Sequence, residues 1–125
     1  MNGPDIVMKV GACEFRVFSA VRYCETVFAD GSKVPAAPQD TDTYRARARE
    51  LGYGDNIWAM CLEHELFHTL WAVSQGFEYS QTLWDVAHGL GEIPSHWMEE
   101  QIVMDLQRTY RGLLASCPSN LIPAR

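Results

Sequence analysis

The feature of this 125-residue chain that most restricts its fold is a long segment that is apolar around most of a helical circumference. Asp55 or Asn56 can cap a helix here, which would run to about Gln75 and end before Gly76. The apolar residues on it are Ile57, Trp58, Met60, Leu62, Leu66, Phe67, Leu70, Trp71 and Val73. A helix that is hydrophobic on nearly every side has to be covered on most of them. We therefore expect this helix to be buried in the middle of its domain.

The first third of the chain has the pattern of β-strands. Residues 6–10 are short and β-branched, and residues 13–21 alternate between apolar and polar side chains over most of their length. Residues 25–29 and 33–34 flank Asp30-Gly31, a strong hairpin signal because glycine tolerates a positive φ. These segments predict a small antiparallel sheet of three or four strands.

Helices are expected in the rest of the chain. Besides the central one, the capping residues and apolar spacing predict helices over residues 42–51, 80–88 and 95–114. Pro35 to Pro38 form a stiff connector before them. Strands first and helices afterwards indicate an α+β fold. We expect one domain over residues 1–125: a sheet part over about 1–35, a helical part over 41–115, and a loose tail over 118–125.

Composition limits the partners. A formal net charge of −6 argues against binding nucleic acid or an anionic membrane, both of which reward clustered Lys and Arg. No apolar run approaches the roughly 18–20 residues of a membrane span, and residues 1–10 do not resemble a signal peptide. The four cysteines have no CxxC spacing, which excludes a zinc ribbon or a thioredoxin motif. We expect a cytoplasmic protein with reduced thiols, and its oligomeric state stays open.

The motif that carries chemistry lies on the central helix, where His64-Glu65-Leu66-Phe67-His68 is an HExxH sequence. Side chains four residues apart stand one turn above each other on one helix face, so two imidazoles can hold one metal ion at about 2.0–2.1 Å. Glu65 is turned by about 100° around the helix. It can therefore reach a water on the metal without displacing either histidine, and act as the base that takes its proton.

In this motif the sequence resembles the zincin metallopeptidases. Their extended motif requires uncharged residues at the positions held here by Leu62, Leu66, Phe67 and Thr69, and the resemblance covers residues 62–70. It implies a Zn²⁺ cofactor and a zincin-like fold. The metzincin branch requires a glycine and a histidine soon after the motif, which residues 69–74 lack. The chain is therefore most similar to a minimal gluzincin, of the kind found in phage-associated and regulatory proteins.

In gluzincins the third metal ligand is a glutamate on a later helix, which here points to Glu99 or Glu100. Glu99 precedes an apolar stripe at helical spacing, formed by Ile102, Val103, Leu106, Tyr110 and Leu113. A carboxylate on a core-facing stripe is costly unless it meets a cation, so Glu99 is the first choice and Glu100 the second. A carboxylate paired with Arg108 is the alternative. The helix over 80–88 is expected to bury an apolar face formed by Leu83, Val86, Ala87 and Leu90. His88 is a rival ligand, but it points about 120–140° away from this face and lies in the last turn, which favours a role at the helix end.

Other side chains have weaker claims. His96 and Tyr79 are possible transition-state donors, Cys61 shares the His64 face, and Asp85 and Glu92 are possible carboxylates that orient a histidine.

Three arginines follow one another at spacing two on the helix over 42–51: Arg45, Arg47 and Arg49. This spacing puts Arg47 nearly opposite the other two, so a solvated helix surface is favoured over a binding patch.

These observations predict a zinc-dependent hydrolase, specifically a small peptidase acting on a peptide or protein substrate. His64, His68 and Glu99 would hold the metal, and Glu65 would take a proton from water and later give it to the leaving amine. A second hypothesis is a non-catalytic, metal-stabilised interaction module or phage-type accessory protein on the same scaffold. In a third, the HExxH arises by chance in an ordinary α+β domain. The topology also departs from small gluzincins, which commonly place a helix before the sheet.

Overall fold

The computed structural model describes residues 3–116. Its elements are the strands β1 (Ile6–Val10), β2 (Cys13–Phe18), β3 (Tyr23–Val27) and β4 (Lys33–Ala36), then the helices α1 (Asp42–Glu50), α2 (Ile57–Ser74), α3 (Gln81–Leu90) and α4 (His96–Ser116). A short 3₁₀ turn, Ser19–Val21, joins β2 to β3. The predicted α+β order, strands first and helices after, is confirmed. The expected tail over 118–125 lies outside the described residues.

The strands form one antiparallel sheet in the order β1-β2-β3-β4. Two details differ from the prediction. The alternation expected up to Val21 stops at Phe18, because the 3₁₀ turn ends at Arg22 in the left-handed conformation and reverses the chain. Pro35 lies inside β4, opposite Glu25, and not in the connector. Because β4 is an edge strand, its outer side needs no ladder partner, and proline is tolerated there.

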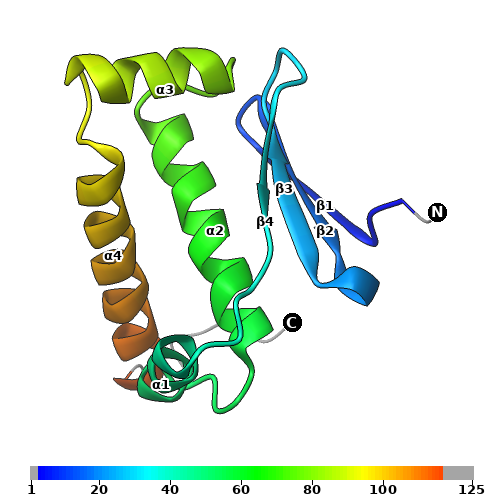
Figure 1. Ribbon diagram of the computed structural model, residues 1–125, viewed down its shortest axis with the longest axis vertical. Helices are drawn as coiled ribbons and strands as arrows, with labels where there is room; N and C mark the ends of the chain where they lie inside the picture. The colour runs from blue at the N-terminus through cyan, green and yellow to red at the C-terminus, as the bar shows by residue number, and fades with distance from the viewer. Residues whose placement is uncertain (1–2, 117–125) are drawn as a thin grey trace.

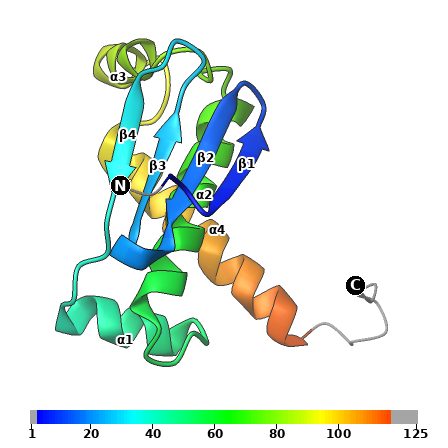
Figure 2. The same cartoon turned by 90° about the vertical axis from the view of Figure 1, so that its right-hand side faces the viewer.

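Helix α2 lies between the sheet and α4, while α3 and α1 lie near its two ends (Figures 1 and 2). It packs against β1, β2, α1 and α4. The side chain of Asn56 caps its first turn by accepting a hydrogen bond from the Ala59 N–H. The central position agrees with the prediction, but the helix is less buried than expected: Met60, Thr69 and Ala72 are its buried residues, and Leu70 is exposed. None of the helices within residues 3–116 is long and apolar enough to cross a membrane.

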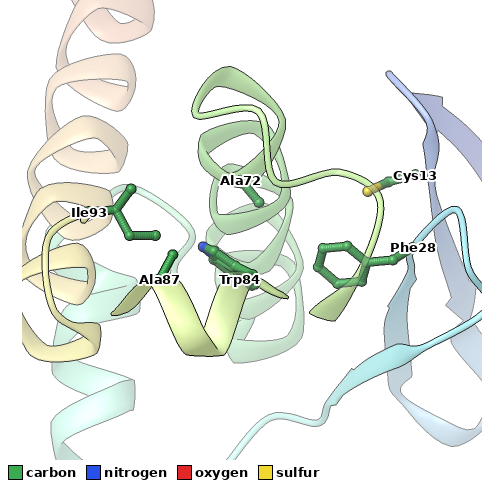
Figure 3. Close-up of a cluster of buried hydrophobic side chains, with 6 residues drawn as sticks. All are labelled: Cys13, Phe28, Ala72, Trp84, Ala87 and Ile93. Atoms are coloured by element: carbon green, nitrogen blue, oxygen red, sulfur yellow. The ribbon is translucent and has the colours of Figure 1, made fainter. Parts of the chain in front are cut away.

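Three apolar clusters hold α2 in place. One joins the ends of the sheet, α2 and α3 and consists of Cys13, Phe28, Ala72, Trp84, Ala87 and Ile93 (Figure 3). A second packs the sheet residues Phe15, Val17 and Cys24 on the middle of α2. The third packs Ala48 and Leu51 of the α1 region on Met60. Together they fix α2 against the sheet and α1, and leave its histidine face toward α4.

The buried faces of α3 and α4 differ from those predicted. On α3, Trp84, Ala87 and His88 are buried, while Leu83, Val86 and Leu90 are exposed. On α4, the buried residues are Glu99, Val103 and Gln107, and the more exposed ones include Leu106, Tyr110 and Leu113. In both helices polar side chains occupy the inner face, because each finds a hydrogen-bond partner there. Hydrophobicity alone therefore gave the wrong face for α3 and a rotated face for α4.

Candidate metal centre

The two motif histidines meet on one face of α2. The Nε2 atoms of His64 and His68 are 3.2 Å apart, and the ring centres are 4.8 Å apart. This is the consequence of a four-residue spacing on a continuous helix. Both side chains are largely buried, at 13% and 17% exposure. The two nitrogens therefore converge on one small region that solvent reaches only in part.

Glu100 of α4 completes this group. Its Oε1 lies 2.7 Å from His64 Nε2, and its Oε2 lies 3.0 Å from His68 Nε2. One ligand atom from each of the three residues falls within 4.8 Å of the others. The Glu100 side chain is 42% exposed, so the group opens to solvent on the α4 side.

The other ring nitrogen of His64 faces Gln107 of α4. His64 Nδ1 lies 3.2 Å from Gln107 Oε1, and Gln107 Nε2 donates to the Met60 carbonyl at 3.0 Å. A carbonyl can only accept, so it fixes which end of the amide is the NH₂ group. The amide oxygen must then accept the proton of His64 Nδ1. Nε2 of a neutral His64 consequently carries a lone pair directed at Glu100 and His68.

Glu99 plays the same part for His68. Its Oε2 lies 2.6 Å from His68 Nδ1, and the carboxylate is 2% exposed. The other oxygen of Glu99 faces His88, so Oε2 is the acceptor toward His68. Nδ1 therefore holds the proton, and Nε2 of a neutral His68 carries a lone pair. Each histidine thus has an acceptor behind it that selects the metal-binding tautomer. Such supporting groups are a regular feature of histidine metal sites.

The donor set fits a small divalent cation. The Nε2 lone pairs of His64 and His68 and the Glu100 carboxylate all face one another. They repel unless a proton or a metal cation lies between them. Ligands about 2.0–2.1 Å from a tetrahedral zinc ion are about 3.3–3.4 Å apart, close to the 3.2 Å between the Nε2 atoms. Without a metal, a proton must take that place. Burial lowers the pKa of His68, but hydrogen bonds to Glu100 and Glu99 outweigh it and raise the pKa to about 9. Hydrogen bonds from His64 and His68 hold the pKa of Glu100 well below its usual range.

Glu99 is therefore not where the sequence analysis put it. It does face the interior, as predicted, but it lies behind His68 and not among the converging ligand atoms. Glu100, and not Glu99, has the carboxylate oxygens that lie close to the Nε2 atoms of both motif histidines. The alternative pairing with Arg108 is also not seen, since Arg108 contacts Glu50 and Asp105. The reason is geometric. The side of α4 that faces α2 lies between the directions of Glu99 and Glu100, so Glu99 contacts His68 at Nδ1 and Glu100 contacts it at Nε2.

His88 is buried and does not have the helix-end role that the sequence favoured. Its Nδ1 donates to the Trp84 carbonyl at 2.9 Å, and its Nε2 lies 2.8 Å from Glu99 Oε1. With Nδ1–H engaged, this second contact requires an additional proton, on His88 or on Glu99. His88 and Glu99 thus form a buried hydrogen-bonded chain that ends on His68.

Glu65 lies beside the candidate ligands and toward the sheet. It lines a hollow of about 260 Å³ that also includes His68, Glu99 and Glu100, with Val34 and Ala36 of β4. Within residues 3–116, no group donates a hydrogen bond to its carboxylate. Burial raises its pKa, His68 and His64 lower it, and Glu100 and Glu99 raise it further, with a net increase. A carboxyl group with a raised pKa beside a metal site has the property required of a general base.

The remaining candidates lie further out. His96 stacks on His88 with ring centres 3.7 Å apart and lies 3.4 Å from Asp85. Asp85 makes no contact with either motif histidine, no contact of Glu92 with them is seen, and Tyr79 is exposed at 59%. Cys61 lines a second hollow beside His64.

Gln107 is the site residue that the sequence analysis missed. The signal was its position seven residues after Glu100, two turns along the same helix face.

Comparisons with protein families, with curated proteins and with solved structures find no significant match to this chain.

Proposed function

We propose that this protein is a zinc-dependent hydrolase, and specifically a peptidase. The observation that carries the proposal is the convergence of His64 Nε2, His68 Nε2 and the Glu100 carboxylate beside the buried Glu65. Three protein ligands of the nitrogen and oxygen type, with the fourth position left to water or substrate, are the donor set of catalytic zinc. This revises the predicted ligand set in one member, with Glu100 in place of Glu99.

In this proposal His64, His68 and Glu100 hold the ion, which supplies Lewis-acid activation of water and of the substrate carbonyl. Glu65 takes the proton of the attacking water and passes it to the leaving amine. The raised pKa of Glu65 favours both proton transfers. A group whose pKa is nearer the working pH can both accept a proton from water and give it to the leaving amine. Glu99 and Gln107 keep the Nδ1 protons in place and so hold both rings in one orientation.

A peptide substrate is favoured by the position of β4. This strand is the edge of the sheet, and Val34 and Ala36 line the hollow that contains Glu65 and Glu100. An edge strand can hold an extended chain by added β-pairing through its outward backbone groups. In β4, Pro35 supplies only its C=O, because proline has no N–H. A peptide laid along β4 would pass in front of Glu65.

The test is Glu65→Gln. We expect both the wild type and the variant to bind about one equivalent of zinc by plasma mass spectrometry. The variant should lose at least about 100-fold in hydrolysis of a peptide library. His64→Ala is the control that should lose the metal. Wild-type protein without zinc, or a Glu65→Gln variant that cleaves at the wild-type rate, would overturn the proposal.

The exposed Leu106, Tyr110 and Leu113 of α4 favour a second candidate, a metal-stabilised module that binds another protein. This second candidate would have the same zinc site as the peptidase but would not cleave peptides. Zinc retained in the wild type, with no cleavage of any library peptide, is the result expected of this second candidate.

A further inference from the structure

Two hollows of different chemical character meet at Glu65. The first, described above, has carboxylates on several sides, from Glu25, Asp85, Glu99 and Glu100. The second opens beside His64, toward α1. Cys24, Ala36 and Glu65 line both, so a chain crossing in front of Glu65 enters one hollow on each side of it. The side chains that line the second hollow would therefore contact substrate residues next to the scissile bond.

The second hollow is mainly apolar and contains one arginine. Its outer walls come from the β4–α1 connection and from α2, at Ala37, Pro38, Trp58 and Met60. Arg47 and Tyr44 of α1 close it on the remaining side. Figure 1 shows α1 lying across the end of α2 that is further from α3. A guanidinium among apolar walls is weakly screened by water and attracts an anion more strongly than one on an open surface.

Arg47 has no acidic partner in the described part of the chain. Its two neighbours on α1 do: Arg45 contacts Asp40 and Asp42, and Arg49 lies 2.9 Å from Asp55. The difference follows from the spacing of two, which turns Arg47 to the opposite side of α1, toward His64 and Glu65. The expectation of a solvated arginine surface therefore applies to Arg45 and Arg49 and not to Arg47.

The guanidinium is also held in place. Its Cζ lies 5.4 Å from the centre of the Tyr44 ring, within the range of a cation–π contact. Glu65 lines the same hollow but makes no ion pair with Arg47. A cation that is oriented by an aromatic ring and makes no ion pair can take an anionic ligand. A carboxylate is the anion that peptides carry, and Arg binds it through two parallel N–H donors.

We propose that Arg47 selects substrates with a carboxylate next to the scissile bond, on the side of the His64 hollow. This inference rests on the proposed peptidase function and names its substrate class. The carboxylate comes either from an Asp or Glu side chain or from the free C-terminus of a short peptide. On the opposite side of Glu65, the acidic hollow disfavours an anion and suits neutral or basic residues.

The experiment digests a proteome-derived peptide library with the zinc-loaded protein and aligns the cleaved bonds. We expect Asp or Glu to be enriched at one fixed position, and the preference for a Glu over a Gln peptide to fall about tenfold in Arg47→Gln. Arg49→Gln is the matched control on the same helix and should keep the wild-type preference. A second library with amidated C-termini separates the sources: a preference that survives amidation comes from side chains, and one that disappears comes from the C-terminus.

A binding measurement keeps the inference testable without turnover. Two peptides that differ only in Glu against Gln are titrated into ¹⁵N-labelled protein, and the side-chain Nε–H signal of Arg47 is followed by NMR. A shift with the Glu peptide alone, lost in Arg47→Gln, supports the anion site even if no bond is cleaved. Cleavage with no acidic preference, or equal shifts with both peptides, would overturn the role of Arg47. Failure to cleave, with the Arg47 shift intact, would instead count against the peptidase.

Discussion

At the scale of single residues, the acceptor behind each imidazole ring is what suits the two motif histidines to hold a metal. Gln107 and Glu99 occupy the Nδ1 sides of His64 and His68, so that both Nε2 lone pairs point toward Glu100. The HExxH sequence supplies the two rings, but nothing within five residues of it selects their tautomers. The selecting groups come from α4, more than 30 residues later.

Glu99 and Glu100 can be separated by the same conservative substitution. Glu100→Gln removes the charged ligand, and we expect zinc affinity to fall by more than about 100-fold. Glu99→Gln should cost about tenfold, at the lower end of what the loss of a supporting group costs. The amide oxygen at position 99 can still accept from His68 Nδ1, and its NH₂ group can donate to His88 Nε2, which supplies the extra proton that this contact needs.

Competition with a chelator of known affinity measures both variants. If Glu99→Gln proved the more damaging of the two, Glu99 would be the ligand after all. Glu92→Gln serves as a control for the loss of one negative charge.

The thiol of Cys61 gives a pH-dependent test of the hollow beside His64. Burial and, to a lesser degree, the nearby Glu65 raise its pKa to about 11. A raised pKa keeps the group as the unreactive thiol at neutral pH, so its reactivity appears only as the pH rises toward that value. We expect iodoacetamide at pH 8 to modify Cys61 more than about tenfold more slowly than a free cysteine peptide. Peptide mapping between pH 7 and 10 measures it, and fast alkylation at pH 7 would contradict the buried environment.

At the scale of elements, local signals predicted most of the structure. Ile6–Val10 forms β1 with the expected bounds, Gly31 has the positive φ of the expected turn, and Thr41, Asn56 and Ser80 cap the three helices that they precede. These features depend on neighbours within four residues, which the sequence displays directly. The inner face of α3 was predicted wrongly, because Trp84 and His88 find buried partners that only the folded chain brings near.

The β1–β2 turn gives a test of how the sheet is joined to the helices. Gly11 has φ +59°, and a Cβ there would lie 2.8 Å from Val73 Cγ1 of α2 and would also collide with the Glu78 carboxylate. That carboxylate accepts a hydrogen bond from Ala12 N at 2.6 Å, so it is not free to move away. We expect Gly11→Ala to lower the free energy of unfolding by roughly 2–3 kcal/mol, measured in urea.

Gly31→Ala is the matched control for backbone strain. Its φ is +87°, but a Cβ there meets nothing within 4 Å. The left-handed conformation alone costs about 1–2 kcal/mol. Equal losses in the two variants would show that the turn does not pack against α2 as described.

At the scale of the whole molecule, the candidate metal centre ties the last long helix to the central one. His64 and His68 lie on α2, and Glu100, Glu99 and Gln107 lie on α4. A metal that binds only the folded state adds RT ln(1 + [L]/Kd) to its stability, about 4 kcal/mol at a thousandfold excess over Kd. Its removal should therefore loosen the packing of α4 against α2.

We expect a chelator to lower the Tm of the wild type by roughly 10 °C or more, and added zinc to restore it. His64→Ala should melt at the same temperature with and without the chelator, because its site no longer holds the ion. Differential scanning calorimetry measures both proteins. A wild type whose Tm is unchanged by chelator and by added zinc would argue against a metal in this site.

The sequence by itself determined the α+β order, the helix that carries HExxH, and the two histidines and Glu65 as a group. Each of these follows from spacing along one strand or one helix. The tertiary structure placed Glu99 behind His68 and Glu100 beside both Nε2 atoms, and it buried His88. It also brought Gln107 to His64 and turned Arg47 toward the candidate site. Adjacent residues on a helix differ by only about 100° in direction. Which of them meets a partner depends on how the helix is rotated against its neighbours, and that rotation is set by packing and by buried polar contacts far apart in the sequence.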